Sequence, residues 1–145
     1  MESRVPVVEH GKVLVVDDDR DMLLLTRMVL EDAFPEVTIR TAWDAADGLQ
    51  ALESEPFDVV LCDYRMPAMD GLRMLYEAAR RRPEARRILM TAYSDPEVER
   101  QALQDSGVDY FLRKGVSPQA LLDTVGLALQ PAGEFALLET PPAPL

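Results

Sequence analysis

The chain has 145 residues, 48% of them apolar, and carries 26 acidic against 15 basic residues for a net charge of −11. This size and composition are typical of one globular domain and exclude a largely disordered chain. The acidic excess argues against direct nucleic-acid binding, because phosphate backbones require clustered Lys and Arg. It favours a cation site or a protein partner.

The sequence predicts neither export nor membrane insertion. Residues 1–10 lack the apolar core of a secretion signal, and the longest apolar runs are too short to cross a bilayer. The one cysteine, Cys62, cannot form an internal disulfide and is typical of a reducing compartment. We therefore expect a cytoplasmic protein with no membrane partner.

Five short apolar runs, rich in β-branched residues, alternate with five helical stretches. The runs that predict strands are 13–16, 37–39, 59–62, 88–90 and 110–112. The stretches that predict helices are 20–34, one following Asp44, one capped by Asp70, one from Ser94 to Gly107 and one from Ser117 to Leu129. The first and third runs are almost unbroken, as in parallel strands that helices cover on both faces.

The strict alternation of strand and helix predicts an α/β domain built on a parallel sheet with right-handed crossovers. Five strand–helix units account for residues 11–130. Residues 1–10 then form an N-terminal lead-in, and the Pro/Ala-rich residues 131–145 form a tail or linker.

Polar side chains follow four of the five predicted strands. They are Asp17-Asp18-Asp19 after the first, Asp63 after the third, Thr91 after the fourth and Lys114 shortly after the fifth. Because the carboxyl ends of parallel strands form the functional edge of such a sheet, we expect these side chains to lie close together. Clustered carboxylates repel one another, and a hard divalent cation such as Mg²⁺ relieves that repulsion.

A carboxylate beside a bound cation can attack phosphorus and form an acyl phosphate. The cation, a lysine and a hydroxyl are then the groups that hold the phosphoryl oxygens. Alone, each residue has an ordinary structural explanation: Asp19 as a helix cap, Thr91 as a structural hydroxyl, Lys114 as a surface charge. Their joint occurrence at one edge makes Asp63 the predicted phosphate acceptor.

Four motifs surround these strand ends. They read Val15-Val16-Asp17-Asp18-Asp19, Asp63-Tyr64-Arg65-Met66-Pro67-Ala68-Met69-Asp70-Gly71, Met90-Thr91-Ala92 and Phe111-Leu112-Arg113-Lys114. In these motifs the chain resembles the receiver domains of two-component response regulators, the CheY-like superfamily, over about residues 11–130. The resemblance implies a flavodoxin-like (βα)5 domain with sheet order 2-1-3-4-5 and helices on both faces.

The resemblance also implies a metal site and a phosphorylation site. Asp63 would accept a phosphoryl group from a histidine kinase or a phosphotransfer protein. Asp18 and Asp63, with the backbone carbonyl of Arg65, would ligate Mg²⁺, for which Mn²⁺ could substitute. Asp17 would position a metal-bound water. The domain would catalyse its own phosphorylation and dephosphorylation without being a turnover enzyme.

A conformational switch is implied in the same way. Lys114 would pair with phosphoryl oxygens, and Thr91 would hydrogen-bond one of them after phosphorylation. Phe111 matches the aromatic residue that packs inward when the threonine moves. The face formed by the fourth helix, the fifth strand and the fifth helix would then control a downstream protein or a fused output domain. The same face is a candidate homodimer contact.

Gly115 departs from the family pattern, which has a proline after a cis peptide bond at this position. A cis bond before a non-proline residue costs about 2.5–4 kcal/mol, so we expect either a trans bond with a rearranged loop or a strained cis bond.

Arg65, Ala92 and Tyr93 would lie on the route to the phosphoryl group. Our hypothesis is that Arg65 and Tyr93 screen it from water.

Three alternatives remain at this point. A phosphatase or phosphotransferase of the haloacid-dehalogenase type also uses an aspartyl phosphate and Mg²⁺, but the chain has only the first part of its motif and no cap domain. A flavin carrier would need a hydroxyl-rich phosphate loop after the first strand, where acidic residues stand instead. A degenerate receiver could serve as a binding scaffold.

The basic cluster at 80–87 is expected at a helix C-terminus, where cations oppose the helix dipole favourably.

Overall fold

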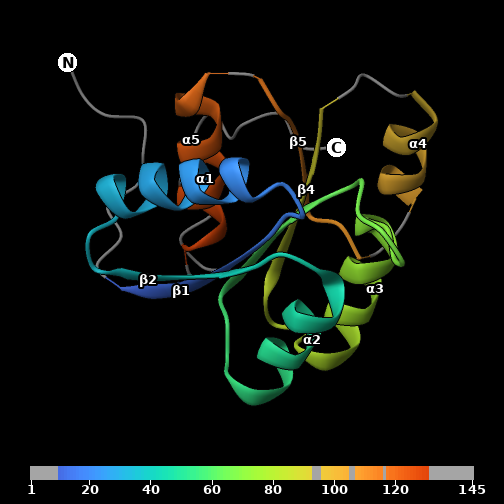
Figure 1. Cartoon of the computed structure of the whole chain (residues 1–145), viewed down its shortest axis with the longest axis horizontal. Coiled ribbons are helices and arrows are strands. Elements are labelled where there is room, and N and C mark those ends of the chain that lie inside the picture. Colours follow the sequence, from blue (N-terminus) through green and yellow to red (C-terminus); the bar gives the residue numbers. More distant parts are fainter. Residues whose placement is uncertain (1–9, 93–95, 105–106, 116, 131–145) are drawn as a thin grey trace.

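The computed structural model describes residues 10–92, 96–104, 107–115 and 117–130 (Figure 1). Five strands alternate with five helices in this part of the chain. Their bounds are β1 Gly11–Val16, α1 Arg20–Ala33, β2 Val37–Ala42, α2 Ala45–Ser54, β3 Val59–Asp63, α3 Gly71–Arg81, β4 Arg86–Thr91, α4 Pro96–Gln104, β5 Tyr110–Arg113 and α5 Pro118–Ala128.

The five strands form one parallel sheet in the order β2-β1-β3-β4-β5. The predicted fold class and strand order are therefore confirmed. Several strands begin earlier or end later than the predicted runs, because ladder pairing continues past the apolar side chains. Gly11 pairs with Val37 at the start of β1, and Val59 pairs with Arg86 at the start of β4.

Helices cover both faces of the sheet (Figure 1). On one face Val13, Val15 and Leu61 pack with residues of α1 and α5. On the other face Val16 and Cys62 pack with residues of α2, α3 and α4. Successive strand residues thus enter opposite halves of the core, which explains why β1 and β3 are apolar at almost every position.

The predicted helix starts are set mainly by aspartate caps. Asp19, Asp44 and Asp70 each accept a hydrogen bond from a backbone N–H three residues on, at 3.2, 2.7 and 2.9 Å. Ser94, the predicted start of the fourth helix, lies outside the described residues. Ser117 makes no side-chain cap bond at α5, where Pro118 occupies the first helical position.

No helix within these residue ranges is both long enough and apolar enough to cross a membrane.

Candidate functional site

The side chains predicted to share one edge do lie together at the carboxyl ends of the central strands. Asp17 follows β1, Asp63 ends β3, Thr91 ends β4 and Lys114 follows β5. A backbone hydrogen bond of 2.7 Å from the Lys114 N–H to the Thr91 carbonyl joins the last two strand ends. Parallel pairing of neighbouring strands therefore delivers residues from four separate segments to one place.

Three carboxylates form the acidic part of the site. Asp17, Asp18 and Asp63 each offer an oxygen, and these oxygens all lie within 4.8 Å of one another. Asp17 and Asp63 are buried, whereas Asp18 is exposed. Burial raises the pKa of the Asp63 carboxyl, the charges of Asp17 and Asp18 raise it further, and Lys114 opposes both effects. The donor set fits a hard divalent cation, which takes oxygen ligands.

Lys114 is the counter-charge of the two buried carboxylates. Its Nζ lies 2.8 Å from Asp17 Oδ2 and 2.9 Å from Asp63 Oδ1, and its side chain is only 13% exposed. Burial alone would lower the pKa of this ammonium, but the hydrogen bonds to Asp17 and Asp63 and the negative charges of these two residues together outweigh burial, so its pKa is raised. The sequence predicted a pairing with phosphoryl oxygens and did not anticipate this direct bridge between carboxylates.

The loop after Lys114 uses a trans peptide bond, the first of the two predicted solutions. No cis peptide bond occurs in the described part of the chain. Gly115 instead adopts a φ of +86°, a backbone conformation that favours glycine. The lysine thus reaches both carboxylates without the proline that the family pattern predicts.

The β3–α3 loop brings Gly71 against the backbone of Asp63. Its N–H donates to the Tyr64 carbonyl at 2.8 Å, and a Cβ at this position would lie 2.3 Å from the Asp63 carbonyl oxygen. Ala68 in the same loop has a φ of +71°, which is uncommon for a residue with a side chain. Sequence reasoning assigned neither residue a role, although the Asp70-Gly71 pair at the helix start was a usable signal.

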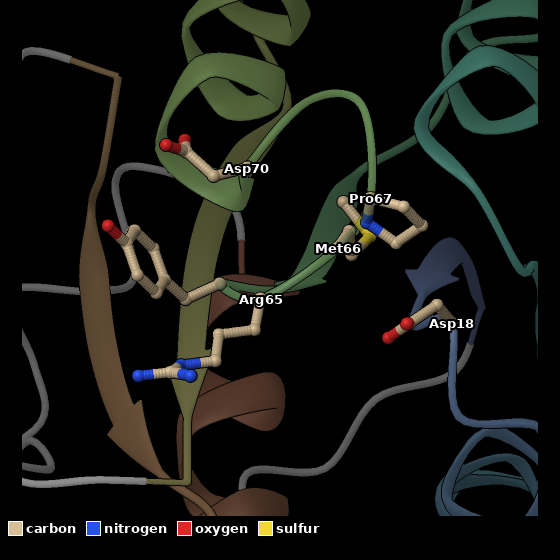
Figure 2. Close-up of a pocket in the computed structure, with 6 residues that line it drawn as sticks. Asp18, Arg65, Met66, Pro67 and Asp70 are labelled. Atoms are coloured by element: carbon tan, nitrogen blue, oxygen red, sulfur yellow. The ribbon is translucent and has the colours of Figure 1, made fainter.

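An open pocket of about 530 Å³ leads to the exposed side of the acidic cluster. It is lined by Asp18, Tyr64, Arg65, Met66, Pro67 and Asp70. Figure 2 shows Asp18 and Asp70 on opposite sides of this pocket, with the Arg65 guanidinium directed away from Asp18. The pocket therefore leaves the Asp18 side of the cluster open to solvent.

The remaining predicted residues lie around this centre. Thr91 is buried, and Ala92 beside it is exposed. Phe111 is half-buried and packs against the core cluster on the α2, α3 and α4 face. Tyr93 lies outside the described residues.

Residues 13–126 match the family of response regulator receiver domains. The chain belongs to this family, as the sequence motifs predicted. Among solved structures, it superposes on a receiver domain protein from Methanospirillum hungatei JF-1 with a TM-score of 0.75 and 32% identity, over 82% of this chain and 93% of that one. It also superposes on the signal receiver domain of an HD domain-containing protein from Pseudomonas fluorescens Pf-5. The TM-score is 0.77 and the identity 28%, over 85% of this chain and 89% of that one.

Curated relatives are larger proteins. The chain is 36% identical over 125 residues to the hydrogenase transcriptional regulatory protein HoxA of Cupriavidus necator, covering 86% of this chain and 25% of HoxA. It is 41% identical over 106 residues to the DNA-binding transcriptional regulator NtrC of Escherichia coli K12, and this match covers 72% of this chain and 22% of NtrC. It is also 36% identical over 151 aligned positions to the sensor histidine kinase GacS of Pseudomonas protegens, and this match covers 97% of this chain and 16% of GacS. The chain thus spans a quarter or less of each of these relatives.

Proposed function

We propose that this receiver domain accepts a phosphoryl group on Asp63 in a Mg²⁺-dependent reaction. The observation that carries the proposal is the position of the Asp63 carboxylate, within 4.8 Å of the Asp17 and Asp18 oxygens and 2.9 Å from Lys114. A carboxylate held among other carboxylates and one ammonium is a nucleophile in a site suited to a cation and to phosphoryl oxygens. The domain bounds 11–130 remain our prediction and include the matched residues 13–126.

In the transfer step an Asp63 carboxylate oxygen forms a bond to phosphorus. The phosphorus–nitrogen bond of the donor phosphohistidine breaks, and its electron pair leaves on the imidazole, which takes up a proton. Lys114 is positioned to pair with a phosphoryl oxygen, since its Nζ already contacts Asp63 Oδ1. The donor would be a histidine kinase or a phosphotransfer protein.

Asp17, Asp18 and Asp63, with the backbone carbonyl of Arg65, would hold the cation. When bound, Mg²⁺, or Mn²⁺ in its place, neutralises charge on the carboxylates and on the transferring group. This chain's contribution is to hold three carboxylates at that point against their mutual repulsion, with two of them anchored by Lys114.

The output would be a change in the face made by α4, β5 and α5. Thr91 ends β4, where its carbonyl accepts from the Lys114 N–H, and Phe111 lies on β5 and packs against the core cluster that includes residues of α4. Thr91 therefore borders the site, and Phe111 belongs to the face. A shift of these two side chains after phosphorylation would alter what the face contacts. Its partner would be a downstream protein, an output domain in the same polypeptide, or a second copy.

Intact-mass measurement tests the proposal. The chain is incubated with Mg²⁺ and a small phosphodonor, and wild type is compared with Asp63→Asn and with Asp32→Asn, an exposed aspartate on α1, as the matched control. We expect one phosphoryl adduct in wild type and in the control, none in Asp63→Asn, and none in EDTA. An equal adduct in all three proteins would refute Asp63 as the acceptor. Continuous release of phosphate from a generic phosphate ester would instead favour the phosphatase alternative.

The lifetime of the acyl phosphate is a separate part of the proposal. Arg65 lines the pocket beside the site, and Tyr93 is placed by the sequence alone. If they screen the site, the double variant Arg65→Asn, Tyr93→Ala should lose its phosphoryl group faster than wild type. An unchanged dephosphorylation rate would mean that neither side chain excludes water.

A further inference from the structure

Arg20 and Trp43 form an exposed stack at the carboxyl edge of the sheet, and neither residue belongs to the acidic cluster. The Arg20 guanidinium carbon lies 3.9 Å from the centroid of the Trp43 indole ring. Arg20 is the first residue of α1, and Trp43 directly follows β2. The Asp17 N–H donates to the Ala42 carbonyl at 3.1 Å, which joins the segment before Trp43 to the segment before Arg20. The stack therefore borders the loop that carries two of the three clustered carboxylates.

Arg20 rests on the ring although carboxylates surround it in the sequence. Within the described residue ranges it forms no ion pair. Asp19 is engaged as the cap of α1, and Asp21 is the next residue along the helix, so its side chain does not face Arg20. A cation–π contact and an ion pair have similar, small free energies at exposed positions. The ring therefore holds the guanidinium in close competition with any carboxylate within reach.

Asp18 is the carboxylate that Arg20 would reach if the ring were absent. Its side chain is exposed and has no hydrogen-bond or ion-pair partner in the part of the chain that the structure describes. Asp17, by contrast, is buried and paired with Lys114. The Cα atoms of Asp18 and Arg20 are at most about 7 Å apart, because the residues are separated by two positions, and an extended arginine side chain covers that distance.

We propose that Trp43 keeps Arg20 away from Asp18 and so leaves the cation site open. Without the ring, the guanidinium pairs with the Asp18 carboxylate, and a divalent cation must displace it before it can bind. Trp43 is thus a positioning residue, which acts on the cation through Arg20. The inference rests on the Mg²⁺ site of the proposed function, but it does not depend on phosphoryl transfer to Asp63.

Mg²⁺ titration of the unphosphorylated chain tests the proposal. The Kd is measured from backbone amide shifts at constant ionic strength for wild type, Trp43→Leu, Arg20→Gln and the double variant. We expect Trp43→Leu to raise the Kd roughly two- to fivefold, since the cation then competes with an exposed ion pair. In the Arg20→Gln background the same change should leave the Kd unaltered, because no guanidinium can occupy Asp18. Trp43→Phe is the matched control, which keeps an aromatic face and should keep the wild-type Kd.

The same spectra report directly on the stack. The ring current of Trp43 should shift the Arg20 Nε–H signal in wild type, and Trp43→Leu should abolish that shift. Because the Trp43 side chain is 49% exposed, its truncation should leave the amide signals of the buried strands unchanged.

Three results would overturn this proposal alone. One is an unchanged Kd in Trp43→Leu. Another is an equal rise of the Kd with and without Arg20, because Trp43 would then support the loop and not hold the arginine. The third is weaker binding by Arg20→Gln alone, because the site would then need the stack itself. Absence of Mg²⁺ binding by wild type would instead refute the cation site of the proposed function, and this inference with it.

Discussion

Removal of Lys114 should destabilise the metal-free domain and make its stability depend on Mg²⁺. The ammonium lies 2.8 Å from Asp17 and 2.9 Å from Asp63, and both carboxylates are buried. Lys114→Met keeps most of the apolar stem and deletes the charge, which leaves two buried carboxylates without their counter-charge. The carboxylates would then repel each other and Asp18 without compensation.

The magnitude follows from the contacts. At an effective dielectric constant of about 20, a contact of this length has a gross attraction of roughly 6 kcal/mol, most of which offsets the cost of desolvating the charges. Loss of one partner from a buried ion pair typically costs about 3–5 kcal/mol. Since Asp18 opens one side of the site to solvent, we expect about 2–4 kcal/mol here, or a fall in Tm of roughly 8–16 °C.

Urea unfolding in EDTA and in Mg²⁺ measures the effect. Lys12→Met is the matched control, because Lys12 pairs with Glu55 at a more exposed position and should cost less than about 1 kcal/mol. Mg²⁺ should restore more stability to Lys114→Met than to wild type, since it supplies the missing positive charge. A Lys114→Met protein as stable as wild type in EDTA would refute the counter-charge argument.

Three further predictions concern Asp63 and the loop that follows it. Ala68→Gly should raise the free energy of unfolding by about 0.5–1 kcal/mol in urea, because glycine relieves the +71° φ; unchanged or lower stability would contradict this. Gly71→Ala should lower the free energy of unfolding by about 1–3 kcal/mol and reduce the phosphoryl adduct, since the new Cβ would lie 2.3 Å from the Asp63 carbonyl oxygen. Because the pKa of Asp63 is raised, its stabilising contribution is present below the ordinary aspartate pKa and is lost as pH rises through the folded value. Asp63→Asn without metal should therefore gain stability relative to wild type as the pH rises from about 4 to 7, and a difference independent of pH would contradict the raised pKa.

Much of the fold followed from side-chain pattern because the pattern reflects burial on two faces. The runs that became β1 and β3 are apolar at nearly every position, since their side chains enter both halves of the core. Aspartates at 19, 44 and 70 marked helix starts, because a short carboxylate can accept the otherwise unpaired backbone N–H groups. The position of the site followed in turn, since parallel strands have a common carboxyl edge.

The details that escaped prediction depend on contacts between distant segments. Arg87 belonged to a basic cluster expected at a helix end, yet it is buried in β4. Its guanidinium donates to the carbonyls of Gly107, Pro83 and Ala85, so it joins two loops at the amino edge of the sheet. A linear pattern cannot supply those acceptors, because a loop carbonyl has no sequence signature. The positive φ of Ala68 could not be predicted from the sequence either, because alanine is not one of the residue types enriched in this conformation.

The charge of the site explains why a divalent cation and a single lysine suit it together. Asp17, Asp18 and Asp63 carry three negative charges when ionised, and Lys114 returns one positive charge, which leaves the cluster two charges short of neutrality. The net charge of the cluster could be counted from the sequence. The sequence did not predict that the lysine bridges the two buried carboxylates and leaves the exposed one to solvent. With Lys114 in that position, the uncompensated charge is concentrated toward Asp18, on the side where the pocket opens. A dication approaching from that side meets the charge that it can neutralise, while the ammonium holds the Asp63 carboxylate in place.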